Sequence, residues 1–144
     1  MESHIADITH VIQLSVAPAF LLVAIGTLIT ILSNRLGRIV DRRRVLQDRL
    51  VNLTGDHATE VAEELTQLTH RGALIYFAIL SAVLGALLVC LVVAGAFIGA
   101  LLSVELAEVV AGLFVLAMGT MVVAWSLLLR EVYLAVRAGA HNRR

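Results

Sequence analysis

The residues best suited to binding a cation lie near the start of the sequence and in a short segment after residue 102. His4, Asp7 and His10 recur at helical spacing, and imidazole and carboxylate groups are ligands for divalent metals. Glu105 and Glu108 lie between the last two apolar segments. Two histidines beside one carboxylate are a weak metal pattern, so we predict no metal site. We interpret Asp7, Glu105 and Glu108 instead as an acidic mouth that concentrates cations.

A line of side chains, all polar except Phe20, runs along the first apolar segment. Gln13, Phe20, Thr27 and Asn34 recur every seven positions, with Thr30 close to the same face. A helix drifts only about 20° per heptad, so these residues form one continuous line. Several copies arranged with this line facing an axis would form a pore, with Phe20 as its constriction. Alternatively, the helix backbone and adjacent helices satisfy the same groups.

Catalytic chemistry has no visible basis in this sequence. No serine or cysteine stands in a recognisable nucleophile setting, and no glycine-rich phosphate loop is present. The single cysteine, Cys90, excludes an intrachain disulfide and a cysteine metal cluster. We therefore predict a protein that is not an enzyme and that carries no cofactor.

The elements that position these residues are three long apolar segments. The 144 residues are 60% hydrophobic and 15% charged, whereas a soluble domain has about a quarter of its residues charged. Segments of about 20 apolar residues can cross the hydrocarbon layer. We predict an all-α membrane protein, a single membrane domain over residues 1–144, with spans at about 11–32, 73–102 and 109–129.

The segment between the first two spans keeps a helical pattern. Apolar residues at helical intervals continue on both sides of a turn from Asn52 to Asp56. Two stripes of similar length joined by a tight turn indicate an antiparallel helical hairpin over about 33–72. We therefore expect the first two transmembrane helices to extend into this hairpin.

Arginine placement predicts the orientation of the chain. Seven arginines lie from Arg35 to Arg71, the other four follow the last apolar segment, and lysine is absent. Because cytoplasmic segments retain arginine and lysine, we place the hairpin and the C-terminus in the cytoplasm and the N-terminus outside. The acidic character of the outer segments then follows in part from the exclusion of arginine.

A group of arginines begins where the first span ends. Such juxtamembrane residues attract anionic lipid head groups, each by about 1 kcal/mol. Acidic residues dilute the basic surface of the hairpin, so we do not expect nucleic-acid binding. The candidate lipid contacts are Arg35, Arg38, Arg42, Arg43 and Arg44.

Small residues at helical spacing mark candidate packing faces in the second and third spans. In lipid, helices associate through close backbone approach, so such residues predict helix contacts. Three helices offer more such faces than one chain buries, so we predict a homo-oligomer; alternatively, these faces only pack the chain against itself. The residues are Ser81, Gly85, Gly95, Gly99, Gly112 and Gly119.

The run Asn34-Arg35-Leu36-Gly37-Arg38-Ile39-Val40-Asp41-Arg42-Arg43-Arg44, after an apolar helix with Ala17-Pro18-Ala19-Phe20-Leu21-Leu22, carries a family resemblance. It resembles a widespread bacterial family of small three-span membrane proteins known only as a domain of unknown function. The resemblance implies the same topology and a bacterial inner-membrane location. It implies no activity.

Two functional interpretations remain open at this point. The first is an integral membrane protein that forms a homo-oligomeric pore lined by the first helix. The second is a non-conducting scaffold or accessory subunit whose cytoplasmic hairpin docks a protein partner. They differ in whether Thr27, Thr30 and Asn34 face water or are buried.

Overall fold

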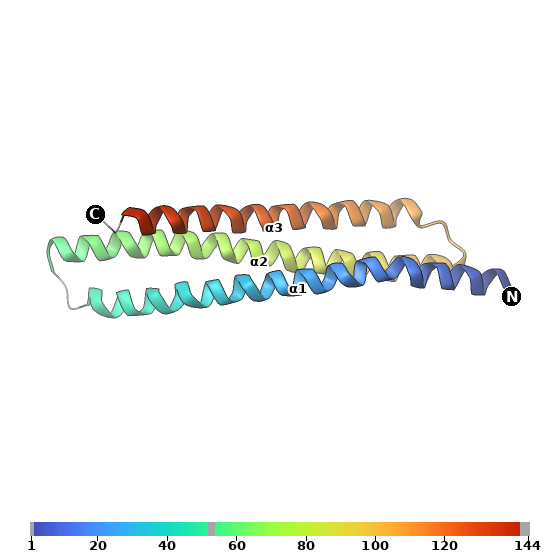
Figure 1. The fold of residues 1–144 in the computed structure, drawn as a ribbon, viewed down its shortest axis with the longest axis horizontal. Helices are drawn as coiled ribbons and strands as arrows, with labels where there is room; N and C mark the ends of the chain where they lie inside the picture. Colours follow the sequence, from blue (N-terminus) through green and yellow to red (C-terminus); the bar gives the residue numbers. More distant parts are fainter. Residues whose placement is uncertain (1, 52–53, 142–144) are drawn as a thin grey trace. The chain divides into compact units, whose positions relative to one another are not determined.

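A computed structural model of the chain consists of three helices (Figure 1). Helix α1 spans Glu2–Leu50, α2 spans Asp56–Leu102 and α3 spans Ala107–His141. The structure describes the backbone of residues 2–51 and 54–141, and the side chains of residues 9–10, 12–13, 15–51 and 54–137. Within these residues no strand is present, and the predicted all-α class is confirmed.

All three helices are long and apolar enough to cross a membrane. The stretches that qualify are Ser15–Leu50, Asp56–Leu102 and Ala107–Arg137. At 1.5 Å of rise per residue, each exceeds the roughly 30 Å of a hydrocarbon layer. The chain is therefore an integral membrane protein, and the predicted spans lie inside these helices.

Helix α1 is longer than its predicted span at both ends. It begins at Glu2 rather than near Val11, and it continues through Pro18 and onward to Leu50. The sequence before Pro18 contains no glycine or proline to break a helix, so the polar residues there continue it. The extension of the first helix beyond the first span was predicted and is present.

Two short turns join the helices, and the structure describes a residue with a positive φ in each. Gly55 (φ 76°) precedes α2, and its carbonyl accepts a hydrogen bond from Ala58 N at 3.0 Å. Ser103 (φ 52°) follows α2, and Val104 N donates to Gly99 O at 3.1 Å. The second arrangement is a Schellman cap, which satisfies a carbonyl at the end of a helix.

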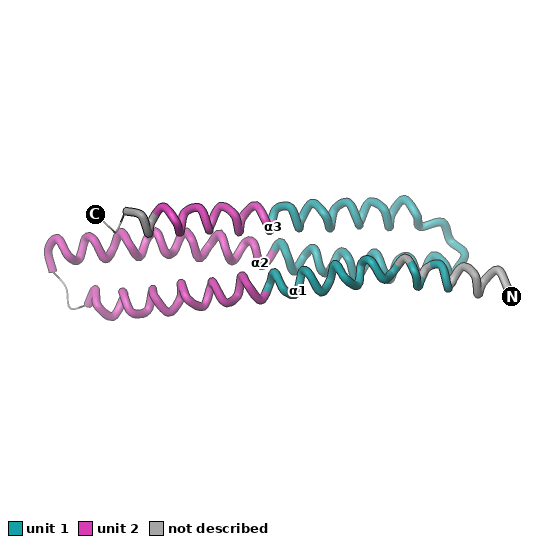
Figure 2. The backbone as a smooth tube through the Cα atoms, viewed as in Figure 1, with its two compact units in different colours: residues 1–29, 81–123 teal, residues 30–80, 124–144 magenta. Residues whose placement is uncertain are grey.

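The chain divides into two compact units, each with a segment of every helix (Figure 2). Unit 1 comprises residues 1–29 and 81–123. Helices α2 and α3 make direct contact there, because Ser81 Oγ donates to Thr120 O at 2.7 Å. The buried side chains of this unit are Ile25 and Leu28 of α1, Ala82, Leu88, Val89 and Val92 of α2, and Ala117 and Met121 of α3.

Unit 2 comprises residues 30–80 and 124–144. Here α1 and α2 are antiparallel, because Ile39 lies against Gly72 and Arg42 lies against Glu64. This pairing is the predicted helical hairpin; its location in the cytoplasm remains a prediction. The buried side chains of unit 2 are Leu32, Ile39, Leu46, Leu68, Leu74, Ile75, Ala78, Ala124 and Glu131.

Candidate functional site

Glu131 is the one buried charged residue among the side chains that the structure describes. It is 1% exposed and lies on α3 in unit 2. Its Oε2 accepts a hydrogen bond from Arg35 Nη1 of α1 at 2.5 Å, and its Oε1 accepts one from Arg71 Nη2 of α2 at 2.9 Å. One carboxylate therefore ties together all three helices.

The two arginines of this charge cluster (Arg35, Arg71 and Glu131) are partly exposed. Their side chains are 32% and 22% exposed, against 2% for Glu131. A buried carboxylate is tolerated only when it is paired and hydrogen-bonded, and here each oxygen has its own guanidinium. The cluster keeps an excess of one positive charge, because two guanidinium groups meet one carboxylate.

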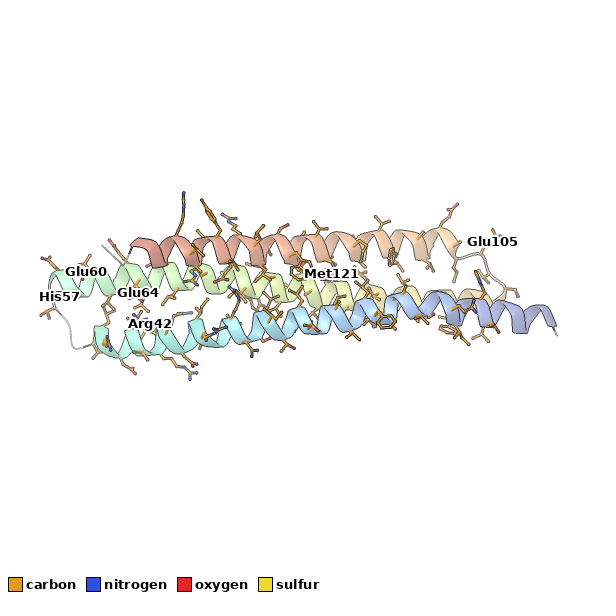
Figure 3. All side chains as sticks on the ribbon, viewed as in Figure 1. Arg42, His57, Glu60, Glu64, Glu105 and Met121 are labelled. Atoms are coloured by element: carbon orange, nitrogen blue, oxygen red, sulfur yellow. The ribbon has the colours of Figure 1, made fainter. Side chains whose placement is uncertain are left out.

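A second ion pair lies farther along the same hairpin. Arg42 donates from Nε and Nη2 to one oxygen of Glu64, at 3.0 and 2.8 Å, and the two side chains point toward one another (Figure 3). Both side chains are nearly half exposed, so water screens this pair. It aligns α1 with α2 but contributes little stability.

The five arginines predicted to contact lipid do not share one environment. Arg35 and Arg42 hold carboxylates, and Arg43 has a buried Nε without a hydrogen-bond partner among the described residues. Arg38 and Arg44 are exposed, and the described residues form no ion pair with either. Of the five, these two are the best placed to meet lipid head groups.

The polar face of α1 (Gln13, Phe20, Thr27, Thr30 and Asn34) lies outside the packing of both units. In unit 1, Gln13, Phe20 and Thr27 are exposed while Ile25 and Leu28 are buried. In unit 2, Thr30 and Asn34 are exposed while Leu32 is buried. Adjacent helices of the chain therefore do not bury this face. The helix backbone does satisfy one of its hydroxyls, since Thr27 Oγ1 donates to Val23 O at 3.1 Å.

The predicted small-residue faces separate into two sets. A Cβ added to Gly85 would lie 2.7 Å from Thr120 Oγ1, one added to Gly95 would lie 3.1 Å from Val110 Cγ2, and one added to Gly99 would lie 3.2 Å from Val104 O. Ser81, Gly85 and Gly95 therefore pack α2 against α3 within the chain, and Gly99 packs against the turn that joins them. Gly112 and Gly119 are exposed, and an added Cβ would meet nothing within 4 Å at either position.

The predicted acidic mouth is only partly described. The side chains of His4 and Asp7 lie outside the described residues, while His10, Glu105 and Glu108 are exposed. Glu108 lies in the first turn of α3, where a carboxylate interacts favourably with the helix N-terminus. Within the described side chains, no group of three or more His, Cys, Asp or Glu residues converges as metal ligands would.

The sequence interpretation missed Glu131. It lies just past the predicted end of the third span, next to Arg130, and so resembles an ordinary solvated residue. The available signal was its helical face. Glu131 follows Ala117, Met121 and Ala124 at helical spacing, and those three residues are buried.

The chain matches a known protein family over most of its length. Residues 15–140 match DUF2721, a family described as a protein of unknown function. The chain belongs to this family. Membership in DUF2721 confirms the predicted resemblance to a family of unknown function, and the match reaches from α1 into the last part of α3. No curated protein and no solved structure matches the chain.

Proposed function

We propose that the chain forms a homo-oligomeric pore in the membrane, lined by the polar face of α1. The observation that carries the proposal is the exposure of that face. Gln13, Thr27 and Asn34 lie on the side of α1 away from the packed helices, where a single chain leaves them to lipid. Polar groups at such positions are stabilised when they face other helices or water.

The chemistry of the polar face suits a narrow aqueous path. Thr27 Oγ1 donates its proton to Val23 O, but a hydroxyl oxygen keeps lone pairs that accept hydrogen bonds from water. Phe20 is 73% exposed on the same side and would narrow the path in an assembly. At the outer end, Glu105 and Glu108 would favour cations over anions.

The proposed setting is the inner membrane of a bacterium, with the N-terminus outside and the hairpin in the cytoplasm. The distribution of arginine supports this orientation. Arg38 and Arg44 then meet anionic lipid head groups at the cytoplasmic surface. The proposed role requires no catalysis, no cofactor and no nucleic acid.

A flux assay tests the pore. Potassium efflux from proteoliposomes that carry the wild-type chain should exceed that from empty vesicles. Thr27→Leu with Asn34→Leu should abolish the efflux, because both substitutions replace water-binding groups on the polar face. The control is Thr69→Leu, since Thr69 is also exposed and also donates to its own helix (Leu65 O, 2.8 Å), but lies on α2. Wild-type vesicles no leakier than empty ones would contradict the proposal.

A non-conducting scaffold is the second candidate. It is favoured by the Thr27 hydrogen bond, which satisfies that hydroxyl without water, and by the charge cluster, which fixes the hairpin. Such a scaffold would present the exposed charges of the hairpin to a cytoplasmic partner. Its signature is absence of efflux together with capture of one partner by the wild-type chain, lost when the charge cluster is broken by Glu131→Gln.

A further inference from the structure

Two exposed series of residues in unit 1 differ in size. On α2, Leu84, Leu91 and Ile98 recur every seven residues and are 47%, 47% and 48% exposed. On α3, Gly112 and Gly119 are also seven residues apart and exposed, with nothing within 4 Å of an added Cβ. Helix α2 thus has large apolar side chains at its surface every seven residues, and α3 has glycines at its surface at the same interval.

The two series lie at matching levels along the helices. Ser81 bonds to Thr120, and Gly95 faces Val110, so the register of α2 against α3 is fixed to within about one helical turn. In that register Leu84 lies level with Gly119, and Leu91 lies level with Gly112. A shift by one heptad would displace the two series by about 10.5 Å.

Neither series can fill the other within one chain, because both face away from the α2–α3 contact. In lipid, helices associate by close packing of large residues against small ones. A second copy in the same membrane orientation runs its α3 antiparallel to the first copy's α2, as the two helices run within one chain. The leucines of one copy then meet the glycines of the next at the same levels.

In unit 2, the exposed charges of α2 and α3 are opposite in sign, which also favours a contact between α2 of one copy and α3 of another. The exposed carboxylates of α2 near its start are Asp56, Glu60 and Glu63, and the exposed histidines His57 and His70 lie on the same stretch. The exposed charges of α3 in this unit are Arg130 and Arg137. Counting along the helices from the Arg71–Glu131 pair places Arg137 within about one turn of the level of Glu63.

We propose that α2 of one copy packs against α3 of the next copy, with Leu84 and Leu91 over Gly119 and Gly112, and with Glu63 near Arg137. This inference rests on the proposed homo-oligomer and identifies its interface. The contact joins two different faces, so it repeats from copy to copy, and it closes into a ring where the rotation between copies divides a full turn. The polar face of α1 takes no part in it and stays available to line the axis.

Cysteine cross-linking in native membranes tests the pairing. Two differently tagged copies, each with Cys90→Ala and one new cysteine, are co-expressed and oxidised. The matched pairs are Leu84→Cys with Gly119→Cys and Leu91→Cys with Gly112→Cys. The swapped pairs, Leu84→Cys with Gly112→Cys and Leu91→Cys with Gly119→Cys, use the same four variants as controls. A Cβ added at either glycine would meet nothing within 4 Å, and Leu84 and Leu91 are about half exposed, so we expect these variants to keep the fold of the chain.

Matched pairs should give heterodimers on a non-reducing gel, whereas swapped pairs should give at least roughly tenfold less. A disulfide requires Cα atoms within about 7 Å, and the swap separates them by a further heptad. Equal yields, or cross-links between two copies of the same variant, would overturn this interface. Absence of cross-links in a protein whose native mass is oligomeric would also overturn this interface. That result would not contradict the proposed oligomer. A monomeric native mass would overturn both.

Charge exchange gives a second measurement. Arg137→Glu should reduce the yield of the Leu84→Cys and Gly119→Cys cross-link when it is placed on the copy with the α3 cysteine. Glu63→Arg on the other copy should restore the yield, because the two charges are then exchanged and still attract each other. Restoration by Glu63→Arg on the same copy instead would contradict a contact between copies.

Discussion

Arg35 and Glu131 lie 96 positions apart in the chain, and a guanidinium nitrogen of the first donates to a carboxylate oxygen of the second at 2.5 Å. Arg71 holds the other oxygen of the same carboxylate. The contact joins the first helix to the third inside unit 2, where Glu131 is buried. A charge in that position must be matched by partners, and its partners come from both other helices.

Removing the negative charge should therefore destabilise the fold. Glu131→Gln leaves two guanidinium groups facing each other without a counter-charge, and we expect a loss of about 3 kcal/mol. Unfolding by a denaturing detergent, followed by circular dichroism, measures it. Glu64→Gln is the matched control, because the exposed Arg42–Glu64 pair is worth no more than about 1 kcal/mol. Equal effects of the two substitutions would contradict the role assigned to Glu131.

Two glycines with similar sequence surroundings should respond oppositely to alanine. At Gly85 the added Cβ would lie 2.7 Å from Thr120 Oγ1, so Gly85→Ala should cost about 1–3 kcal/mol through overpacking. At Gly119 nothing lies within 4 Å of an added Cβ. Gly119→Ala should therefore raise the free energy of unfolding of the monomer by between zero and about 1 kcal/mol. The same detergent titration on monomeric protein compares the two variants. A stable Gly85→Ala variant would show that α2 and α3 pack more loosely than described.

The three helices and the hairpin could be predicted because each depends on local patterns. Apolar length marks a span, and arginine–acid pairs between apolar positions mark a helix that continues into water. The run from Leu32 to Leu50 has no breaking residue pair, so the continuation of α1 followed from the sequence alone.

The faces of the helices could not be predicted in the same way. In a soluble helix the buried face is the apolar one, but a lipid-exposed face is apolar as well. Gly85 and Gly119 therefore look alike in sequence, although one packs within the chain and the other does not. Likewise, Arg35 has the sequence pattern of a surface arginine, and only the structure shows that it pairs with Glu131 of α3.

The turn after α2 offers a test of backbone strain. Ser103 has a φ of 52°, a conformation that costs a residue with a Cβ about 1–2 kcal/mol. Ser103→Gly should raise stability by about 1 kcal/mol, whereas Ser103→Val should lower it, because a β-branched residue fits this region poorly. Detergent unfolding of the two variants measures the difference. Equal stabilities would mean that the cap at Val104 N and Gly99 O does not depend on this conformation.

Lipid preference should depend on the arginines that hold no carboxylate. Arg38→Gln with Arg44→Gln removes two exposed charges, each worth about 1 kcal/mol at an anionic surface, so the preference for anionic over neutral lipid should fall roughly thirtyfold. Competitive retention of phosphatidylglycerol and phosphatidylcholine by the purified chain measures this preference. Arg42→Gln is the control, because that guanidinium already donates to Glu64. A larger effect from Arg42→Gln would reverse this assignment.

The proposed pore requires that copies of this chain close around the polar face of α1. Subunit stoichiometry tests it most directly, by native mass spectrometry of the wild-type protein in lipid nanodiscs. We expect a single closed ring of about four or more copies, because each chain contributes only one polar helix to the wall of the path. A monomer or a dimer could not enclose one, and either result would contradict the pore.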